Sequence, residues 1–405
     1  MTDYKNIFIT GATGVVGKPL LQKLIDNNHN IYALSRSNET AKSLSELNVT
    51  PISGDLFDPS LFDQLNEHNI DAIFHVAGMN KMCAKNPDAM FHINIEGTKS
   101  MLDLGNKLGI KKFIYTSSAV TLGEEKGLPG NEDAVHRGSF LSNYEKSKFE
   151  AEVEAFKYSK NFVFVSVNPS SVQGPGRVSG TAKLLISSLN KKYPPLLKNN
   201  ISIIDIDNCT DGHYNALLYG IDNERYVLNS FHVTSEELIR RVKKVTNWDG
   251  SPIYIPKGLL KSAGPLFDLV SAFSSGESII CRESVRVLTH GHVYDGSKAQ
   301  SDLKIDYIDV DSFIHKIISW LIAGLSYSLS LQSGGIVDAV PVLGAMAFGA
   351  QRLLPALQQI YSAWATITGG RASLDDAITL LEQPLPTELL QTAPPPLSFE
   401  KPIRF

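Results

Sequence analysis

Short apolar runs alternate with amphipathic stretches along the first half of the chain. The run "NIFIT" at residues 6–10 is followed by "KPLLQKLIDNN", in which leucines recur at helical spacing. Five later apolar runs are also typical of strands, with helical stretches such as "FHINIEGTKSMLDLGNKLG" between them. They cover residues 30–36, 49–56, 71–78, 111–120 and 161–171. Apolar strands separated by helices predict an α/β protein with a doubly wound, Rossmann-type parallel sheet covered on both faces.

A glycine motif, "GATGVVG", stands between the first predicted strand and the first predicted helix. Gly11 permits a tight turn, Gly14 lets the backbone approach a pyrophosphate, and Gly17 allows close packing of helix and strand. The helix amides that follow would bind the phosphates. The motif therefore predicts a dinucleotide-binding loop formed by Gly11, Thr13, Gly14, Val15, Val16 and Gly17.

The end of the second predicted strand bears on the choice of cofactor. An acidic residue there accepts the 2′-hydroxyl of NAD, whereas an arginine accommodates the 2′-phosphate of NADP. Ser35 and Arg36 occupy this stretch, and the first acid after them is Glu39. We therefore expect NADP(H) rather than NAD(H), while a merely solvated Arg36 is the alternative.

Four polar motifs lie at the carboxyl ends of predicted strands: "GDL", "HVAG", "TSS" and "NPSS". In an open parallel sheet these ends meet at one edge, where ligands bind. A fifth motif, "SNYEKSKFEAE", places Tyr144 four residues before Lys148 at the start of a predicted helix, so that both side chains lie on one face. Taken alone, this pair is either a solvated surface pair or a proton-transfer couple.

With these motifs in this order, residues 4–325 resemble the extended branch of the short-chain dehydrogenase/reductase superfamily. Later segments such as "NPSSVQGPGR" look most like its dihydroflavonol reductase and sugar-epimerase members. The resemblance implies that Tyr144 is the acid/base, Lys148 its helper and Ser118 the hydroxyl that holds the substrate oxygen. It also implies cofactor contacts at Asp55 and Leu56 (adenine), at Val76, Ala77 and Gly78, and at Pro169 and Ser171 (nicotinamide side).

This resemblance implies an NAD(P)-dependent enzyme that reduces a ketone or oxidises a secondary alcohol. Epimerisation of a nucleotide sugar through a transient keto intermediate uses the same residues and stays open, as does a protein that only senses the dinucleotide. A dehydratase is disfavoured, because Ser118 is followed by Ala119, Val120 and Thr121 rather than by acids. The expected partner is a small carbonyl compound or a nucleotide sugar, and a homodimer is left open.

Composition excludes several other classes. The net charge of −4 gives no reason to expect nucleic acid as a partner. Cys83, Cys209 and Cys281 are far apart and form no metal-binding spacing, so we expect three thiols, with no disulfide framework and no metal. The start of the chain, "MTDYKNIFIT", has no leader-like pattern, and the catalytic domain is expected in the cytoplasm.

The last 80 residues differ from the rest. Asparagine is absent from residues 326–405, and Lys401 is the one lysine there. We expect an NADP-binding domain at 1–171, a small α/β substrate cap with remaining core elements at 172–325, a helical segment at 326–386, and a proline-rich end at 387–405.

The segment at 326–405 resembles the last membrane helix and the linker of an ATP-binding-cassette exporter. No phosphate-binding GxxxxGK[ST] loop accompanies it, so ATP-driven transport is not expected. Membrane contact through residues 317–350 is one hypothesis, because residues 317–337 carry no charge. A fusion or truncated reading frame is the other.

Overall fold

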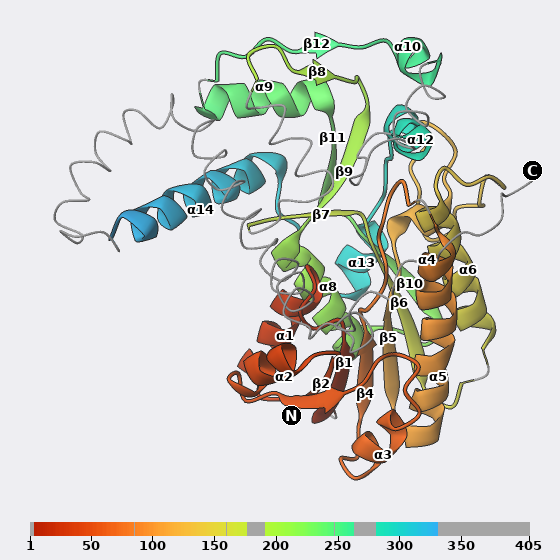
Figure 1. Cartoon of the computed structure of the whole chain (residues 1–405). Coiled ribbons are helices and arrows are strands. Elements are labelled where there is room, and N and C mark those ends of the chain that lie inside the picture. The colour runs from red at the N-terminus through yellow and green to blue at the C-terminus, as the bar shows by residue number, and fades with distance from the viewer. Residues whose placement is uncertain are drawn as a thin grey trace, which may run out of the picture. The chain divides into compact units, whose positions relative to one another are not determined.

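The apolar runs at the start of the chain form a parallel sheet (Figure 1). The computed structural model describes residues 4–84, 86–158, 160–175, 191–246, 248–262 and 281–330. All of them belong to the first of two compact units, Met1–Pro355, and the second unit, Ala356–Phe405, lies outside the described residues. The predictions for the tail beyond residue 330 therefore also lie outside them.

Seven parallel strands make up the main sheet. They are β1 (Asn6–Thr10), β2 (Asn30–Ser35), β3 (Thr50–Ser53), β4 (Ala72–His75), β5 (Lys112–Thr116), β6 (Val163–Pro169) and β10 (Glu224–Leu228). Their order across the sheet is β10-β6-β5-β4-β1-β2-β3, so the direction of winding reverses between β1 and β4. The predicted Rossmann-type sheet is confirmed, and a dinucleotide is expected at such a reversal point.

Helices cover both faces of this sheet. One face packs against α1 (Gly17–Asp26), α2 (Asn38–Ser45) and α8 (Ile206–Tyr219), and the other against α3 (Leu61–Asn66), α5 (Gly97–Leu108) and α6 (Asn143–Lys157). The leucines of α1 illustrate why this helix forms where it does. Leu20, Leu21 and Leu24 recur at helical spacing and are buried in the core beneath it.

Shorter elements connect these layers. Between β4 and β5 the chain forms α4 (Asp88–Phe91), a π-helical turn η1 (His92–Glu96) and α5, and a 3₁₀ turn η2 (Ala119–Leu122) follows β5. Helix α13 (Ser297–Asp302) lies beside β10, and its Ala299 joins the core.

A cap lies beyond the carboxyl ends of the strands (Figure 1). It contains a three-stranded sheet of β11 (Phe231–Thr234), β9 (Asn200–Asp205) and β7 (Ser171–Gln173), and a two-stranded sheet of β12 (Ile253–Tyr254) and β8 (Pro195–Leu196). Its helices are α9 (Ser235–Thr246), α10 (Lys257–Ser262), α12 (Arg282–His290) and α14 (Val310–Ser330). A small α/β cap is therefore present, as the sequence predicts.

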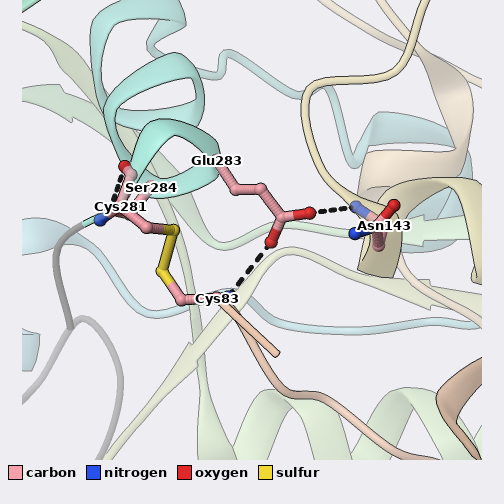
Figure 2. The surroundings of a disulfide bond; sticks show 5 residues. All are labelled: Cys83, Asn143, Cys281, Glu283 and Ser284. Atoms are coloured by element: carbon pink, nitrogen blue, oxygen red, sulfur yellow. Dashed lines mark hydrogen bonds between the residues drawn. A yellow bond between two sulfur atoms is a disulfide. The ribbon is translucent and has the colours of Figure 1, made fainter. Parts of the chain in front are cut away.

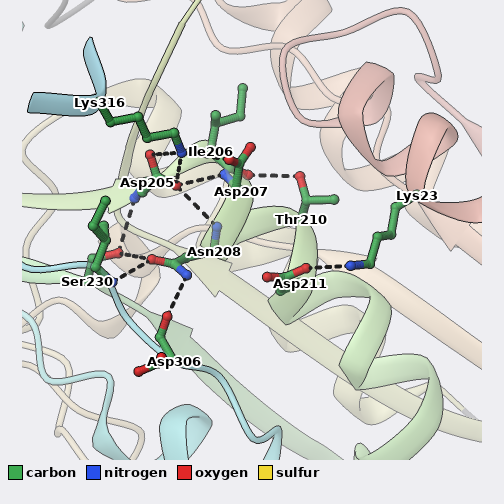
Figure 3. A network of polar contacts seen from close by, with 11 residues as sticks. Lys23, Asp205, Ile206, Asp207, Asn208, Thr210, Asp211, Ser230, Asp306 and Lys316 are labelled. Atoms are coloured by element: carbon green, nitrogen blue, oxygen red, sulfur yellow. Dashed lines mark hydrogen bonds and ion pairs between the residues drawn. The ribbon is translucent and has the colours of Figure 1, made fainter. Parts of the chain in front are cut away.

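The first turns of α14 are part of the cap. Ile314 is buried with Val233 and Leu238, and Lys316 forms ion pairs with Asp205 at 2.6 Å and Asp207 at 2.7 Å (Figure 3). The Asp205 carboxylate also accepts hydrogen bonds from backbone amides in the first turn of α8. Lys316 therefore fixes α14 to the start of α8.

The uncharged stretch that begins at residue 317 continues α14 to Ser330. Among the described residues, no helix combines the length and the apolar character that crossing a membrane requires. The predicted membrane contact at 317–350 thus receives no support from the described part of that segment.

The expectation of three free thiols is wrong. Cys83 and Cys281 form a disulfide, with their Cα atoms 5.9 Å apart (Figure 2). Cys209, in α8, is buried and lies outside this disulfide. The pairing could not be read from the sequence because 198 residues separate the two partners, and only the cap places α12 beside the loop that follows β4.

Candidate active site

The glycine turn after β1 packs directly against the end of β4. Gly11 has a φ of +72°, and a Cβ added there would lie 2.7 Å from the backbone nitrogen of Ala77. A Cβ added to Gly17 would lie 2.0 Å from the Gly11 carbonyl oxygen. Both positions therefore require glycine, because any side chain would push the turn, α1 and β4 apart.

The tip of this turn faces outward. Thr13, Gly14 and Val15 are exposed, and Val16 is half-buried next to the first helical residue of α1. The Gly14 amide donates to the Gly11 carbonyl at 3.0 Å and closes the turn. An exposed backbone turn ahead of a ten-residue helix fits the pyrophosphate of a dinucleotide.

Arg36 and Asp55 follow the ends of the paired strands β2 and β3. The Gly54 amide donates to the Ser35 carbonyl at 3.0 Å, which ties the two strand ends together. Arg36 and Asp55 are exposed, whereas Leu56 is buried. The predicted contacts to the adenosine end of the cofactor are thus brought to one place at the same sheet edge as the glycine turn.

Lys148 lies between the ends of β4 and β5. Its Nζ donates to the Thr116 carbonyl at 2.7 Å and lies 4.4 Å from the centre of the Tyr115 ring. A Cβ added to Gly78 would lie 3.8 Å from the same Nζ. Contacts therefore run without a break from the glycine turn through Ala77 and Gly78 to Lys148.

Burial changes the acid–base properties of this lysine. Lys148 is 4% exposed. Loss of water lowers its pKa to about 7, although the nearby Glu152 carboxylate opposes the change. The side chain can therefore gain and lose a proton near neutrality, and the alternative of a solvated surface pair is excluded for its lysine member.

Tyr144 occupies the second position of α6, four residues before Lys148, and is half-buried. Ser142 caps the helix by accepting from the Glu145 amide at 3.1 Å. The amide of Asn143, the first helical residue, donates to Glu283 of the cap at 2.9 Å (Figure 2). The start of this helix is therefore held both by its own cap and by α12.

Asn94 joins the loop after β4 to α6. Its Oδ1 accepts from the Met79 amide at 2.8 Å, and its Nδ2 donates to the Met79 carbonyl at 3.0 Å and to the Ser147 hydroxyl at 2.9 Å. Asn94 therefore ties the backbone of the loop after β4 to α6. The π-helical turn η1 aims the amide at both partners.

Ser118 ends the segment after β5 and is 8% exposed. Its carbonyl oxygen accepts from the Thr121 amide at 3.1 Å and from Asn168 Nδ2 at 3.3 Å. Asn168 also donates to the buried carboxylate of Glu152 at 2.8 Å. Sequence reasoning missed this positioning role of Glu152 and Asn168. The spacing of Glu152, four residues after Lys148, was the one available signal.

Pro169 and Ser171 lie at the end of β6 and the start of β7, next to Ser117, whose amide donates to the Val167 carbonyl at 2.7 Å. They are thus on the same edge as Ser118. His75 is fully buried, and its Nδ1 forms a hydrogen bond with the Thr10 hydroxyl at 2.8 Å, so it is a core histidine. Burial lowers the pKa of His75 to about 3, and the charge of Lys148 adds to this effect.

Comparisons with known proteins identify relatives of this chain. Residues 7–217 match the NAD dependent epimerase/dehydratase family. A putative dihydroflavonol 4-reductase of Synechocystis sp. is 25% identical over 323 residues, which are 77% of this chain and 93% of the relative. A putative UDP-glucose 4-epimerase of Methanocaldococcus jannaschii is 23% identical over 330 residues, 78% of this chain and 98% of the relative.

The fold also occurs in solved structures. The crystal structure of Gre2 from Candida albicans in complex with NADPH has a TM-score of 0.60 and 20% identity, covering 79% of this chain and 99% of that one. The comparisons give no support to the resemblance of residues 326–405 to an exporter.

Proposed function

Since the chain belongs to the NAD dependent epimerase/dehydratase family, we propose that it is an NAD(P)-dependent oxidoreductase that reduces a ketone or oxidises a secondary alcohol. Tyr144 is the proposed acid/base, Lys148 its partner, and Ser118 the donor to the substrate oxygen. The similarity to a putative dihydroflavonol 4-reductase over most of both chains supports reduction of a carbonyl.

The observation that carries this proposal is the position of Lys148. Its Nζ is fixed 2.7 Å from the Thr116 carbonyl, next to Gly78, while Tyr144 lies one helical turn away on the same helix. A lysine held only for stability has no need to meet the end of β4 at the reversal point of the sheet. From there we expect Lys148 to reach both the bound dinucleotide and Tyr144.

The chemistry follows from these positions. A free phenol has a pKa of about 10, which is too high for ready proton exchange near neutrality. The Lys148 ammonium, one helical turn from Tyr144 and on the same helix face, would stabilise the phenolate that forms when the phenol gives up its proton. Tyr144 then donates a proton to the substrate oxygen during reduction, or accepts it during oxidation. The Ser118 hydroxyl donates to the same oxygen as negative charge builds on it.

A bound nicotinamide supplies or accepts the hydride. The pyrophosphate of the dinucleotide would be held by the glycine turn, formed by Gly11, Thr13, Gly14, Val15, Val16 and Gly17. The rest of the dinucleotide would be lined by Asp55, Leu56, Val76, Ala77, Gly78, Pro169 and Ser171. We propose NADP(H) rather than NAD(H), because the exposed Arg36 follows β2 at the position where proteins of this fold bind the 2′-phosphate of NADP.

Epimerisation of a nucleotide sugar is the second candidate. The similarity to a putative UDP-glucose 4-epimerase over 98% of that relative favours it. The same tyrosine, lysine and serine would act, but the hydride would return to the substrate within one turnover.

One experiment separates these functions. The full chain is mixed with NADPH or NADH and a panel of ketones and nucleotide sugars, while absorbance and products are followed. A reductase consumes the reduced cofactor in proportion to alcohol formed. An epimerase converts a sugar with no net change in cofactor. Cofactor binding without turnover on any compound of either class would remove the proposal in favour of a dinucleotide sensor.

A further inference from the structure

A cluster of metal-ligating side chains lies beside the proposed active site. Glu124 follows η2, the turn that begins directly after Ser118, and His290 and His292 stand at and just after the end of α12. The Nδ1 of His292 lies 2.6 Å from Glu124 Oε1, and the Nε2 of His290 lies 3.4 Å from the same oxygen. The side chains of Glu124 and His290 are 2% and 8% exposed, and that of His292 is 17% exposed.

These contacts leave three buried polar atoms without a hydrogen-bond partner. They are Glu124 Oε2, His290 Nε2 and His292 Nε2. Buried polar atoms are normally paired, and leaving one unpaired is unfavourable. The Tyr294 hydroxyl also lies 2.9 Å from His292 Nδ1. The contacts of the cluster therefore converge on that nitrogen and on Glu124 Oε1, and they leave the other three atoms unpaired.

The charges around the cluster also suit a cation. One oxygen of the Glu124 carboxylate faces both imidazoles, at 2.6 Å from His292 Nδ1 and 3.4 Å from His290 Nε2. The nearby Arg137 donates to the Glu124 carbonyl oxygen at 3.3 Å, but its charge is paired with Glu145. Glu124 is thus left as the anionic partner of two imidazoles.

We propose that Glu124, His290 and His292 bind one divalent first-row transition-metal ion of the Zn²⁺ class. One ligand atom from each residue lies within 4.8 Å of the others. Zinc–ligand bonds of about 2.0–2.2 Å place tetrahedral ligands roughly 3.3 Å apart, close to the 3.4 Å between His290 Nε2 and Glu124 Oε1. The Glu124 carboxylate has to move slightly away from His292 Nδ1, and the ion takes the place of the contacts that this nitrogen makes with Glu124 and Tyr294.

The ligand set selects the class of metal. Two imidazoles and one carboxylate suit zinc and its neighbours, whereas calcium and magnesium prefer oxygen ligands alone. Three protein ligands leave a further position for water or for an oxygen of a small molecule. The ion would join the segment after Ser118 to the loop after α12, and so tie the sheet edge to the cap.

The sequence concealed this site. His290 and His292 are separated by one residue, but Glu124 lies 168 positions before His292. No local spacing motif joins them, which is why the sequence predicted no metal. Folding of the cap is what brings them together.

The test measures metal rather than turnover. The full chain, prepared without a polyhistidine tag and stripped with a chelator, is titrated with Zn²⁺ by calorimetry, and its metal content is then measured. We expect one ion per chain. Each of Glu124→Gln, His290→Gln and His292→Gln should weaken binding by about 100-fold or more. His232→Gln, at an exposed position of β11, is the matched control and should leave binding unchanged.

Absence of binding to the wild-type chain overturns the proposal, as does equal binding by the wild type and the three ligand variants. Should a variant fail to fold, crystals of the wild-type chain soaked in Zn²⁺ provide an independent answer. An anomalous peak about 2 Å from both imidazoles supports the site. A peak elsewhere, or none, overturns it.

Discussion

Glu283 of α12 accepts a hydrogen bond from the backbone amide of Asn143, the first residue of the helix that carries Tyr144, at 2.9 Å. The other oxygen of the same carboxylate accepts from the Cys83 amide at 3.0 Å. One side chain of the cap thus connects the loop after β4 to the start of α6. The disulfide between Cys83 and Cys281 lies immediately beside it (Figure 2).

We expect Cys83→Ser to lower the free energy of unfolding by about 2–4 kcal/mol, because the disulfide limits the freedom of the unfolded chain. Urea denaturation, with and without a dithiol reductant, measures this. The wild type in reductant should match Cys83→Ser. Cys209→Ala, which removes the cysteine outside the disulfide, should be as sensitive to reductant as the wild type. A wild type indifferent to reductant would contradict the prediction.

Tyr144→Phe should fold and bind NADPH like the wild type but lose turnover by about 10²–10⁴-fold, since the ring stays and the proton donor goes. Steady-state kinetics on the best substrate of the panel, with fluorescence titration of NADPH, measures both effects. Tyr219→Phe, on the exposed end of α8, is the matched control. Wild-type turnover in Tyr144→Phe would remove the assignment.

Gly17→Ala should weaken NADPH binding by about 100-fold or more, because the added methyl group would lie 2.0 Å from the Gly11 carbonyl oxygen and must displace the turn. Fluorescence titration gives the affinity, and circular dichroism shows whether the fold is kept. Gly258→Ala is the control, as no atom lies within 4 Å of its added Cβ. Equal NADPH affinity in Gly17→Ala and the wild type would place the cofactor elsewhere.

Arg36→Leu should raise the KM for NADPH by roughly 10- to 100-fold, which corresponds to loss of a hydrogen bond to a charged group, and leave the KM for NADH nearly unchanged. The ratio of the two constants is the measurement. Lys42→Leu, in the last turn of α2, controls for general loss of positive charge. If both cofactors respond alike, Arg36 does not recognise the 2′-phosphate.

Lys148 should also make stability depend on pH. Burial lowers its pKa from 10.5 to about 7 in the folded chain, so between these values the unfolded chain binds more protons. The stability of the wild type relative to Lys148→Met should therefore rise as pH increases from 7 to 10. Urea denaturation of both proteins across this range measures the difference, with Lys146→Met, at an exposed position of α6, as control. A difference that is flat or falls with pH would be inconsistent with a buried, charge-destabilised lysine.

The sheet could be predicted because its strands are short apolar runs whose order follows from the alternation with helices. The glycine turn and the strand-end motifs could also be predicted, because each consists of residues that are neighbours in the sequence. For Lys148, the sequence predicts that it shares a helix face with Tyr144, because the two residues are four positions apart. Its burial follows from the position of that face against the edge of the sheet.

The cap was beyond such reasoning. Cys281, Glu283, His290 and His292 meet residues that precede them in the chain by between 140 and 200 positions. Such contacts depend on how α12 is placed over the sheet, and no periodicity in the sequence encodes that placement. The error over the cysteines has this cause.

The bond between Cys83 and Cys281 encloses Ser118, Tyr144 and Lys148 in one covalent ring of the chain. A single proteolytic cut inside that ring leaves the two fragments attached, and they separate on a gel only after reduction. A cut outside it releases a piece at once. A single cut in the stretch that holds the proposed catalytic groups therefore does not release a fragment while the disulfide is intact.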